Sequence, residues 1–394
     1  MKNFLFSSKI FKGSRYGEGH PLNIDRVWPS LDLLKIMNWV SNEQLVFNEP
    51  ASIDELTIFH DIDYLRILQK AEKFQDLDLK EKKKYNLGVG VNPIFKEVYS
   101  RPASAAKSSM RAIEFLASGK AEKILNFSGG THHGRKNFAS GFCFLNDCIL
   151  AMLKAKEFGF NKILYIDLDA HHCDAVQDYF LDDNNVQLIS IHEKNKWPRT
   201  GKIEESKINN LMNIPVPENF NDNEMIFILN ELVIPYCEIL NPDITIIQAG
   251  TDSLKDDPQS KMILSNSTYW HTISMLKDIS AKTLILGGGG YNPYITAKAW
   301  AGNWLVLNSK EKLLQSKLTD ECKEILRSLK WKNSRVRNGI PNKWLDKWVD
   351  DVEEMPIRHE VKEIVEYIHK IKKFQVIFFS NFGLLFNFSN INFL

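Results

Sequence analysis

The sequence predicts an α/β protein of three layers, in which a doubly wound, mainly parallel sheet carries helices on both faces. Two observations indicate this class. Short apolar segments such as 163–166, 186–191 and 243–248 alternate with longer segments of helical spacing. Most of these apolar segments lead into loops rich in glycine, histidine and aspartate, and in doubly wound folds the functional side chains lie where parallel strands end. With 394 residues, 44% of them hydrophobic, the chain can form one large domain or two smaller ones.

The composition bounds the location of the protein and its partners. The formal net charge is +1, so the whole chain has no attraction to polyanions, and we expect no direct nucleic-acid binding. The five cysteines form neither a C-x-x-C pair nor a secretory pattern, which fits a reducing cytosol. No apolar run reaches the roughly 20 residues of a membrane-spanning helix, and the N-terminus holds too few apolar residues for a signal peptide. We therefore expect a cytoplasmic protein without a membrane span.

The first 120 residues are expected to begin with a strand and to continue mainly as helices and loops. The glycine-bearing loop SRYGEGHPLNIDR, which contains Arg26, follows the opening strand. The segment YNLGVGVNPIF is a loop, because glycine and proline interrupt any regular period. The expected elements are a strand near 4–10, a helix over about 30–40, a short strand and then a helix within 53–67, a solvent-facing helix end over 70–84, and a packed helix over 103–116.

From residue 123 onward, strands and helices alternate regularly. Pro235 falls inside one helical segment and should kink or end that helix, because proline has no backbone N–H. The expected strands are 123–127, 163–166, 186–191, 243–248 and 283–286, and the expected helices are 146–158, 225–239, 267–279 and one that contains Trp300 and Trp304.

The character of the sequence changes near residue 310. Residues 311–373 are rich in lysine and glutamate and predict helices that are broken near Pro341 and Pro356. Residues 374–394 are apolar and aromatic, but serine, asparagine and glycine interrupt them too often for a membrane span. We therefore divide the chain into a main domain over 1–310, a helical C-terminal extension over 311–373, and an apolar tail over 374–394 whose order and role the sequence does not define.

The segment 162–174, KILYIDLDAHHCD, is the strongest functional signal. Its apolar part predicts a buried strand, and the acids and imidazoles that follow include Asp167, Asp169 and His171. Because alternate residues of an extended strand face the same side, these three side chains can converge. A helix-capping aspartate followed by solvated histidines is the simpler reading. His172 and Asp174 add to the cluster, and five such residues at one strand end favour a site.

Three other strand ends carry polar residues that could complete this site. His132 and His133 follow a pair of glycines, Asp252 follows Gly-Thr, and Tyr291 follows the four glycines 287–290. Each has an ordinary structural explanation, namely surface histidines, a helix cap, a tight turn and a packed tyrosine. Their joint placement at successive strand ends makes coincidence a poor explanation.

The chemistry that these residue types support is metal-assisted hydrolysis of an amide. Asp169, His171 and Asp252 supply two carboxylates and one imidazole, which leaves open positions on a metal ion for water and a carbonyl oxygen. His132 and His133 are suited to proton transfer. Asp167 and Asp174 can orient the Nδ1–H groups of the histidines, and the Tyr291 hydroxyl can donate to a developing oxyanion.

These motifs resemble those of the zinc-dependent histone deacetylase family, in the arginase–deacetylase superfamily. The resemblance rests on GGTHHGRKNFASGFCFLND, ILYIDLDAHHCDAVQ, LISIHE, AGTDSLKDDP and GGGGYNP, and extends more weakly from HPLNIDR to about residue 310. The tail is more similar to the acetoin-utilisation branch than to nuclear enzymes. The resemblance implies that 1–310 is a catalytic domain that removes acetyl or other acyl groups from Nε-acetyl-lysine of proteins, with a role in acetoin or acetate metabolism. Acetylpolyamine amidohydrolase activity and a non-catalytic acyl-lysine binding role are the alternatives.

The resemblance also implies a role for each matched residue. Asp169, His171 and Asp252 would bind Zn²⁺, with Fe²⁺ as the alternative, and His133 would be the general base and acid beside His132. Asp167 and Asp174 would be the histidine partners, and Tyr291 would polarise the carbonyl. The acyl-lysine tunnel would be formed by Gly141, Phe142, Trp197 and Gly289, and Arg26 would lie beside an acetate exit channel. A structural K⁺ would be bound by Asp167 and Ser190 together with the carbonyls of Asp169, His171 and Ile191.

Two positions depart from the family pattern, and both concern the substrate. Val91 stands where a rim aspartate usually holds the substrate backbone, and Gln259 stands where an apolar pocket residue is common. A two-manganese ureohydrolase would carry D-A-H-x-D, whereas Cys173 takes the last place here, which disfavours that reading. The substrate is therefore expected to be an acetylated protein or a small acetylated amine.

Overall fold

The computed structural model describes residues 2–372, so the predicted apolar tail lies outside the described residues. Within them, eight strands form one sheet in the order β2-β1-β3-β8-β7-β4-β5-β6, and every neighbouring pair is parallel. The strands are β1 Asn3–Ser7, β2 Leu45–Phe47, β3 Lys123–Asn126, β4 Ile163–Asp167, β5 Val186–Glu193, β6 Leu211–Val216, β7 Ile244–Gln248 and β8 Thr283–Leu286. The predicted parallel sheet is confirmed.

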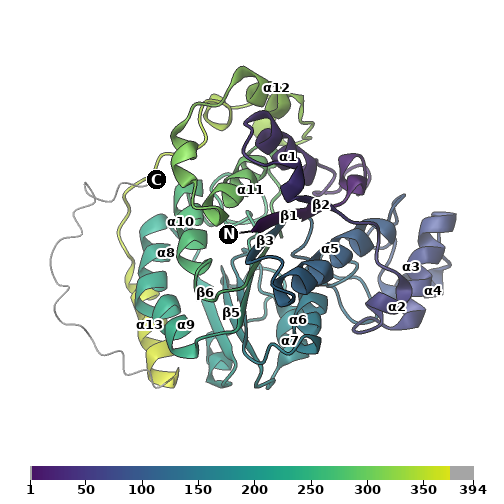
Figure 1. Cartoon of the computed structure of the whole chain (residues 1–394), viewed down its shortest axis with the longest axis horizontal. Coiled ribbons are helices and arrows are strands. Elements are labelled where there is room, and N and C mark those ends of the chain that lie inside the picture. The colour runs from purple at the N-terminus through teal and green to yellow at the C-terminus, as the bar shows by residue number, and fades with distance from the viewer. Residues whose placement is uncertain (1, 373–394) are drawn as a thin grey trace.

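Helices cover both faces of this sheet, as the sequence predicts (Figure 1). One face carries α5 Ser100–Ala117, α6 Asp147–Glu157 and α7 Asp174–Phe180, and the other carries α1 Val27–Ile36, α8 Asp222–Ile228, α10 Asn266–Leu276 and α11 Pro293–Leu307. Alternate residues of β4 divide between two apolar cores. Ile163 and Tyr165 pack with the first set of helices, and Leu164 and Ile166 pack with the second. This alternation defines the three layers.

One predicted strand is wrong, and one observed strand was not predicted. The short strand expected within 53–67 is wrong, because Ser52 and Glu55 form a capping box that begins α2 Ile53–Leu56, and α3 Ile62–Phe74 follows. The strand of this region comes earlier, as β2. The sequence also gave no sign of β6, in which Asn213 and Pro215 interrupt the apolar pattern. Because β6 is an edge strand, Pro215 costs it no ladder hydrogen bond on the open side.

The helix expected over 225–239 is interrupted near Pro235, as predicted. Its first part is α8, its middle part Leu229–Val233 is π-helical, and its last part is α9 Ile234–Leu240. The wider π-helical turn lies directly before the proline, where the missing N–H and the ring disturb the regular hydrogen-bond ladder.

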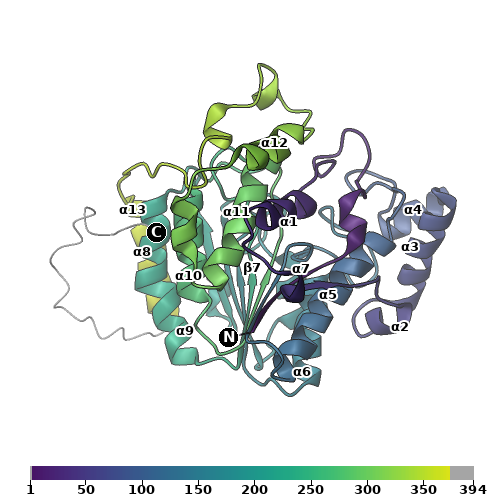
Figure 2. The same cartoon turned by 45° about the horizontal axis from the view of Figure 1, so that its top comes forward.

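The C-terminal extension is only partly helical and packs on the main body. It contains α12 Asp320–Ser328 and α13 His359–Lys372, joined by short 3₁₀ turns, and α12 lies beside α1 (Figure 2). Trp348 is fully buried, with its ring centroid 4.8 Å from that of Trp39. Apolar residues of the extension thus belong to the same core as α1 and α11, and the division near residue 310 stays a prediction. Across residues 2–372, no helix combines the length and the apolar character needed to cross a bilayer.

Candidate active site

Loops that follow four neighbouring strands bring most of the predicted site residues together. β3, β8, β7 and β4 are consecutive in the sheet. His132 and His133 follow β3, Tyr291 follows β8, Asp252 follows β7, and the segment 167–174 continues from the end of β4. Parallel strands end at the same edge of a sheet, so side chains far apart in the sequence meet there.

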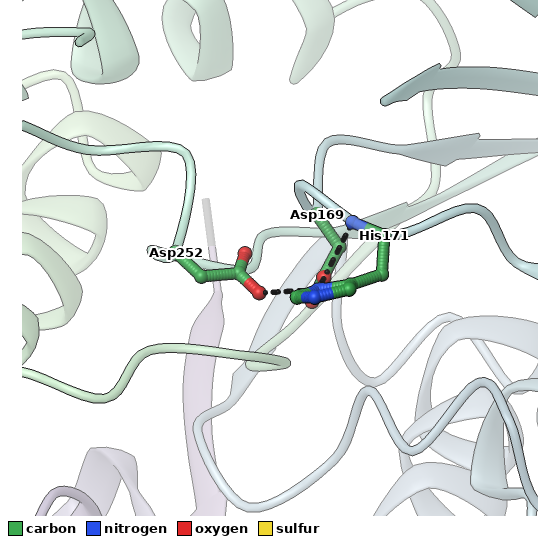
Figure 3. Close-up of side chains that lie close together, drawn as sticks. All are labelled: Asp169, His171 and Asp252. Carbon is green, nitrogen blue, oxygen red and sulfur yellow. Dashed lines mark hydrogen bonds and ion pairs between the residues drawn. The ribbon is translucent and has the colours of Figure 1, made fainter. Parts of the chain in front are cut away.

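Asp169, His171 and Asp252 form a buried group whose ligand atoms all lie within 4.8 Å of one another. The three side chains point toward one another from two loops (Figure 3). His171 Nδ1 lies 3.0 Å from Oδ1 of Asp169 and 2.9 Å from Oδ2 of Asp252. One nitrogen and two carboxylate oxygens are therefore directed at one point, which is the arrangement that a divalent metal ion requires.

The second oxygen of each carboxylate is fixed by a hydrogen bond. Oδ2 of Asp169 accepts from the Gln248 side chain at 2.9 Å and from the Gly289 N–H at 2.8 Å. Oδ1 of Asp252 accepts from the Ala170 N–H at 3.0 Å. These contacts orient the free oxygens toward His171, as ligand partners do in metal sites. Two carboxylates and one imidazole fit Zn²⁺ or Fe²⁺ with positions left for other ligands.

Protonation of this group follows from its crowded negative charge. Burial alone would lower the pKa of His171, but hydrogen bonds and charges from Asp169 and Asp252 raise it to about 10. Burial and the charge of Asp169 raise the pKa of Asp252 above its ordinary value. Burial would also raise the pKa of Asp169, but the charges of His132 and His171 hold it well below its ordinary value. A proton on His171 thus balances the carboxylates, and a metal ion would have to displace it.

The tandem histidines each contact one aspartate. His132 Nδ1 lies 2.8 Å from Oδ2 of Asp167, and His133 Nδ1 lies 2.7 Å from Oδ1 of Asp174. The other oxygen of Asp174 accepts from Arg135 at 2.5 Å. The two imidazole rings lie close together and are tilted by 52°, with centroids 3.9 Å apart. Because an ionised carboxylate only accepts, each Nδ1 carries the hydrogen, and Nε2 of a neutral ring faces away as an acceptor.

The two histidines differ in charge. Burial would lower the pKa of His132, but the charges of Asp167 and Asp169 raise it to about 9. Burial lowers the pKa of His133 to about 3, and the charge of His132 adds to this effect. Burial would raise the pKa of Asp174, but the hydrogen bond from His133 helps to lower it to about 2. At neutral pH a charged His132 therefore stands beside a neutral His133 that can accept a proton.

A cavity runs along these groups. His133, Gly141, Phe142 and Tyr291 are among the residues that line it. The ring of Trp197 approaches His133, with centroids 4.6 Å apart, and the ring of Phe142 lies 5.9 Å from that of Tyr291. Three of the predicted tunnel residues, Gly141, Phe142 and Gly289, and the predicted polarising tyrosine thus line the same space as the tandem histidines, and Trp197 packs against His133.

Two of the predicted glycines are required by this close packing. Gly141 has φ +53°, and a Cβ there would overlap the Trp197 ring and lie 2.7 Å from Cδ2 of His133. A Cβ at Gly289 would overlap Oδ2 of Asp252 and lie 2.6 Å from its Cγ. Any side chain at either position would displace a group of the site.

Arg26 lies at the inner part of the cavity and holds the glycine loop after β8. Its Nη1 donates to the carbonyls of Gly288 and Gly290 at 2.9 and 3.0 Å, and its guanidinium lies 5.0 Å from the centroid of the Trp300 ring. Burial lowers the pKa of Arg26, and nearby acidic groups oppose that effect. The acetate exit channel that the family resemblance implies beside this arginine stays a prediction.

Comparison with protein families gives a match to the histone deacetylase domain over residues 20–307. The chain belongs to the histone deacetylase family. This membership makes it a hydrolase of the deacetylase type that acts on acetylated substrates, in a family that is metal-dependent.

Relatives and solved structures of this deacetylase agree with that family. It is 31% identical to histone deacetylase 8 of Xenopus tropicalis over 274 residues, which is 68% of this chain and 74% of the relative. It is 30% identical to the acetoin utilization protein AcuC of Bacillus subtilis over 315 residues, 77% of this chain and 81% of the relative. A crystal structure of an HDAC homolog from Aquifex aeolicus matches 94% of this chain and 100% of its own, with a TM-score of 0.87 and 33% identity. An HDAC homolog complexed with SAHA matches with a TM-score of 0.88 over the same shares of the two chains, at 33% identity.

The rim of the deacetylase cavity carries no carboxylate at residue 91. Val91 is 53% exposed, and its carbonyl oxygen lies 3.0 Å from Nε2 of His20. The Leu22 N–H donates to Nδ1 of the same ring, so Nε2 carries the hydrogen that Val91 accepts. Gln259, the second departure, lines a pocket on the far side of Tyr291. Neither position belongs to the metal group.

Sequence reasoning missed residues that hold this deacetylase site together. Gln248, the last residue of β7, donates to Asp169, and its own Oε1 accepts from the Gly250 N–H. Asp257 accepts from the Tyr291 N–H at 2.6 Å, and burial and the charge of Asp252 raise its pKa to about 8. A polar residue at the end of a buried strand was a signal for Gln248. Asp257 gave none, because an aspartate before proline is common in turns.

The predicted monovalent cation site is placed in part. Asp167, the last residue of β4, and Ser190 of β5 are paired in register, which brings them side by side. The Ser190 hydroxyl is 2.9 Å from Nδ1 of His192, and the Asp167 carboxylate also accepts from the Tyr165 hydroxyl at 2.6 Å. The site for K⁺ stays a prediction.

Proposed function

We propose that this deacetylase is a zinc-dependent lysine deacetylase that hydrolyses the Nε-acetyl amide of acetyl-lysine in proteins. The observation that carries the proposal is the convergence of Asp169, His171 and Asp252 at a cavity that Asp169, a neutral His133 and Tyr291 line. Two carboxylates and one imidazole are the donor set that zinc accepts in catalytic sites with open positions. Fe²⁺ suits the same donors, and metal availability would decide between them.

The narrow part of the cavity positions the substrate. Phe142 and Trp197 would flank the aliphatic stem of acetyl-lysine, and the absence of side chains at Gly141 and Gly289 leaves room for it. When bound, the zinc ion would polarise the amide carbonyl and lower the pKa of an attacking water. The Tyr291 hydroxyl would donate to the carbonyl oxygen as negative charge develops there.

His133 would transfer the proton. Its Nε2 would accept a proton from the attacking water as the water oxygen bonds to the acyl carbon. The same proton would then go to the lysine nitrogen as the C–N bond breaks, which yields acetate and a free lysine amine. Asp174 holds the ring in the required tautomer and stabilises the imidazolium, and the charged His132 beside it disfavours a second stable positive charge.

Three finer assignments accompany this proposal. A structural K⁺ would bind Asp167 and Ser190 with the carbonyls of Asp169, His171 and Ile191. A cytoplasmic location is supported by the five cysteines, all of which are free and buried. The similarity to the acetoin utilization protein AcuC supports a role in acetoin or acetate metabolism.

The test is an assay of protein freed of metal and then reloaded with Zn²⁺ or Fe²⁺. We expect an acetyl-lysine peptide with neutral flanking residues to be hydrolysed only after metal is restored. Acetylated polyamines serve as the second substrate class, and faster turnover of these would favour an acetylpolyamine amidohydrolase. A metal-filled protein that binds the peptide but releases no acetate would be an acyl-lysine binding protein, and the proposal would be wrong.

A further inference from the structure

A second pocket adjoins the entrance of the catalytic cavity, and the C-terminal extension builds one of its walls. The pocket has a volume of about 370 Å³ and is lined by three separate segments, 15–24, 258–259 and 330–333, together with Tyr291. Tyr291 also lines the catalytic cavity, so the two spaces share a wall. His20, in the first segment, packs its ring 4.6 Å from the ring of Phe142, which ties the pocket to the tunnel entrance.

The wall from the extension is strongly basic. Between residues 327 and 343 the sequence contains no aspartate or glutamate, and it contains Arg327, Lys330, Lys332, Arg335, Arg337 and Lys343. We call this stretch the basic segment. Lys330 and Lys332 line the pocket, and the first forms no ion pair with any residue of 2–372. Lys332 lies 3.6 Å from Glu18, but the two side chains are 87% and 91% exposed, so solvent weakens this pair.

The basic segment is fixed relative to the catalytic tyrosine. Trp331 packs edge-on against Tyr294, three residues after Tyr291, with ring centroids 6.2 Å apart. Tyr294 also stacks on Trp344 at 5.4 Å, and its hydroxyl donates to the Leu329 carbonyl. The Trp344 indole and Lys343 both donate to Asp256, in the loop that carries Asp252. The aromatic contacts of Trp331 and Trp344 with Tyr294 therefore hold the basic segment next to the pocket.

Few negative charges oppose these cations around the entrance. Glu18 is the single acidic residue that lines the pocket, and Arg15, which also lines it, pairs with Asp25 outside it. Val91, whose carbonyl oxygen contacts His20 of this pocket, provides no carboxylate there. A net positive entrance attracts anionic peptides and repels cationic ones, and this effect acts on both affinity and association rate.

We propose that this pocket binds acidic residues that flank the acetyl-lysine, so that the preferred substrate is an acidic segment of an acetylated protein. The inference rests on the proposed lysine deacetylase function and names its substrate class. It disfavours basic histone-like tails and acetylated polyamines, because both would place positive charge beside Lys330 and Lys332. It also gives the C-terminal extension a part in substrate selection.

The test compares three acetyl-lysine peptides of equal length whose flanking residues are glutamate, lysine or serine. At low ionic strength we expect kcat/KM for the glutamate peptide to exceed that for the lysine peptide by about tenfold or more, since several weak charge contacts act together. This ratio should shrink as salt is raised, because screening weakens exposed charge pairs. The serine peptide tests the proposed function by itself, since its hydrolysis needs no charge contact in the pocket.

A pair of charge-reversal variants makes the test specific. K330E/K332E should lower the glutamate-to-lysine ratio to one or below. K310E/K312E makes the same change of charge where the main domain meets the extension. These exposed lysines follow the far end of α11, a 15-residue helix about 22 Å long that begins two residues after Tyr291. The control should keep the ratio of the unchanged protein. Hydrolysis of the serine peptide with no preference for glutamate, or an equal change of the ratio in both variants, would overturn the inference while leaving the deacetylase function in place.

Discussion

His171 Nδ1 lies 2.9 Å from Oδ2 of Asp252, which is 81 positions further along the chain. The contact exists because β4 and β7 are neighbours in the sheet and both end at the same edge. A protein with either loop displaced would lose it. The pair therefore connects the strand order directly to the metal site that we propose.

The first prediction concerns Asp252. Asp252→Ala removes one of three proposed ligands and one of two carboxylates, so we expect the purified variant to contain little or no metal. Elemental analysis after expression with added zinc measures this directly. Asp351→Ala, at a side chain that is 86% exposed, is the matched control and should keep a full complement. A metal content in Asp252→Ala equal to that of the control would refute its role as a ligand.

The second prediction concerns His133. His133→Ala should lower kcat for the neutral acetyl-lysine peptide by roughly 10²–10⁴-fold, which is the usual contribution of a general acid–base group. Metal content should stay full, since this side chain forms its hydrogen bond with Asp174 and is not one of the three proposed ligands. His359→Ala, at a side chain that is 85% exposed, should leave turnover unchanged. Activity of His133→Ala close to that of the control would remove His133 from the mechanism.

How far the sequence predicted this site depends on the kind of residue. The four strand ends could be predicted because apolar runs mark the strands and the polar residues follow them directly. Their neighbourhood in the sheet could not be derived from periodicity, and it is the strand order that brings β3, β8, β7 and β4 together. The family resemblance supplied what local pattern alone did not.

The roles of the supporting residues could not be predicted, because they depend on tertiary neighbours. A polar residue at the end of a buried strand marks Gln248, but its hydrogen bond to Asp169 exists only because β7 lies beside the 167–174 loop. Asp257 gains its role only when the Tyr291 N–H approaches it. β6 was missed because a proline and an asparagine break its apolar pattern, and only its place at the sheet edge makes them acceptable.

The third prediction concerns Gly141. Gly141→Ala places a methyl group against the Trp197 ring and 2.7 Å from the His133 ring, in a backbone conformation that disfavours side chains. We expect the entrance to be distorted, with kcat/KM for the acetyl-lysine peptide lowered by at least about tenfold, because positioning errors near 1 Å are costly. Metal content should be unchanged. Gly13→Ala meets no atom within 4 Å and is the control. Normal kinetics in Gly141→Ala would show that the entrance tolerates the methyl group.

The last prediction concerns His60, a buried histidine that hydrogen-bonds to Lys136 and Asn146, two residues of the segment that follows the tandem histidines. Its Nδ1 lies 3.2 Å from the Lys136 carbonyl, and its Nε2 accepts from the Asn146 N–H at 3.0 Å. The Asn146 side chain in turn donates to the His132 carbonyl. Since a carbonyl can only accept, Nδ1 carries the hydrogen and Nε2 has none, so the neutral ring satisfies both contacts. Protonation of Nε2 would break the contact to Asn146.

The pH dependence of stability follows with a definite sign. Burial lowers the pKa of His60 from 6.5 to about 3 in the folded protein. Above pH 6.5 the ring is neutral in both states and adds no dependence on pH. Between pH 6.5 and about 3 the unfolded chain binds a proton that the folded protein does not. The free energy of unfolding therefore falls as the pH is lowered, and His60 contributes up to about 1.4 kcal/mol per pH unit to this fall.

His60→Gln removes this titration while it keeps a side chain that can donate and accept. Denaturant unfolding at pH 6, 5 and 4.5 should therefore give a shallower loss of stability in His60→Gln than in the unchanged protein, by roughly 1 kcal/mol per pH unit. The comparison uses the slope, because the substitution can also lower stability at every pH. Other buried histidines and carboxylates contribute equally to both proteins and cancel in the difference. His359→Gln, at an exposed position, should keep the original slope, and an unchanged slope in His60→Gln would mean that His60 is protonated alike in the folded and unfolded states.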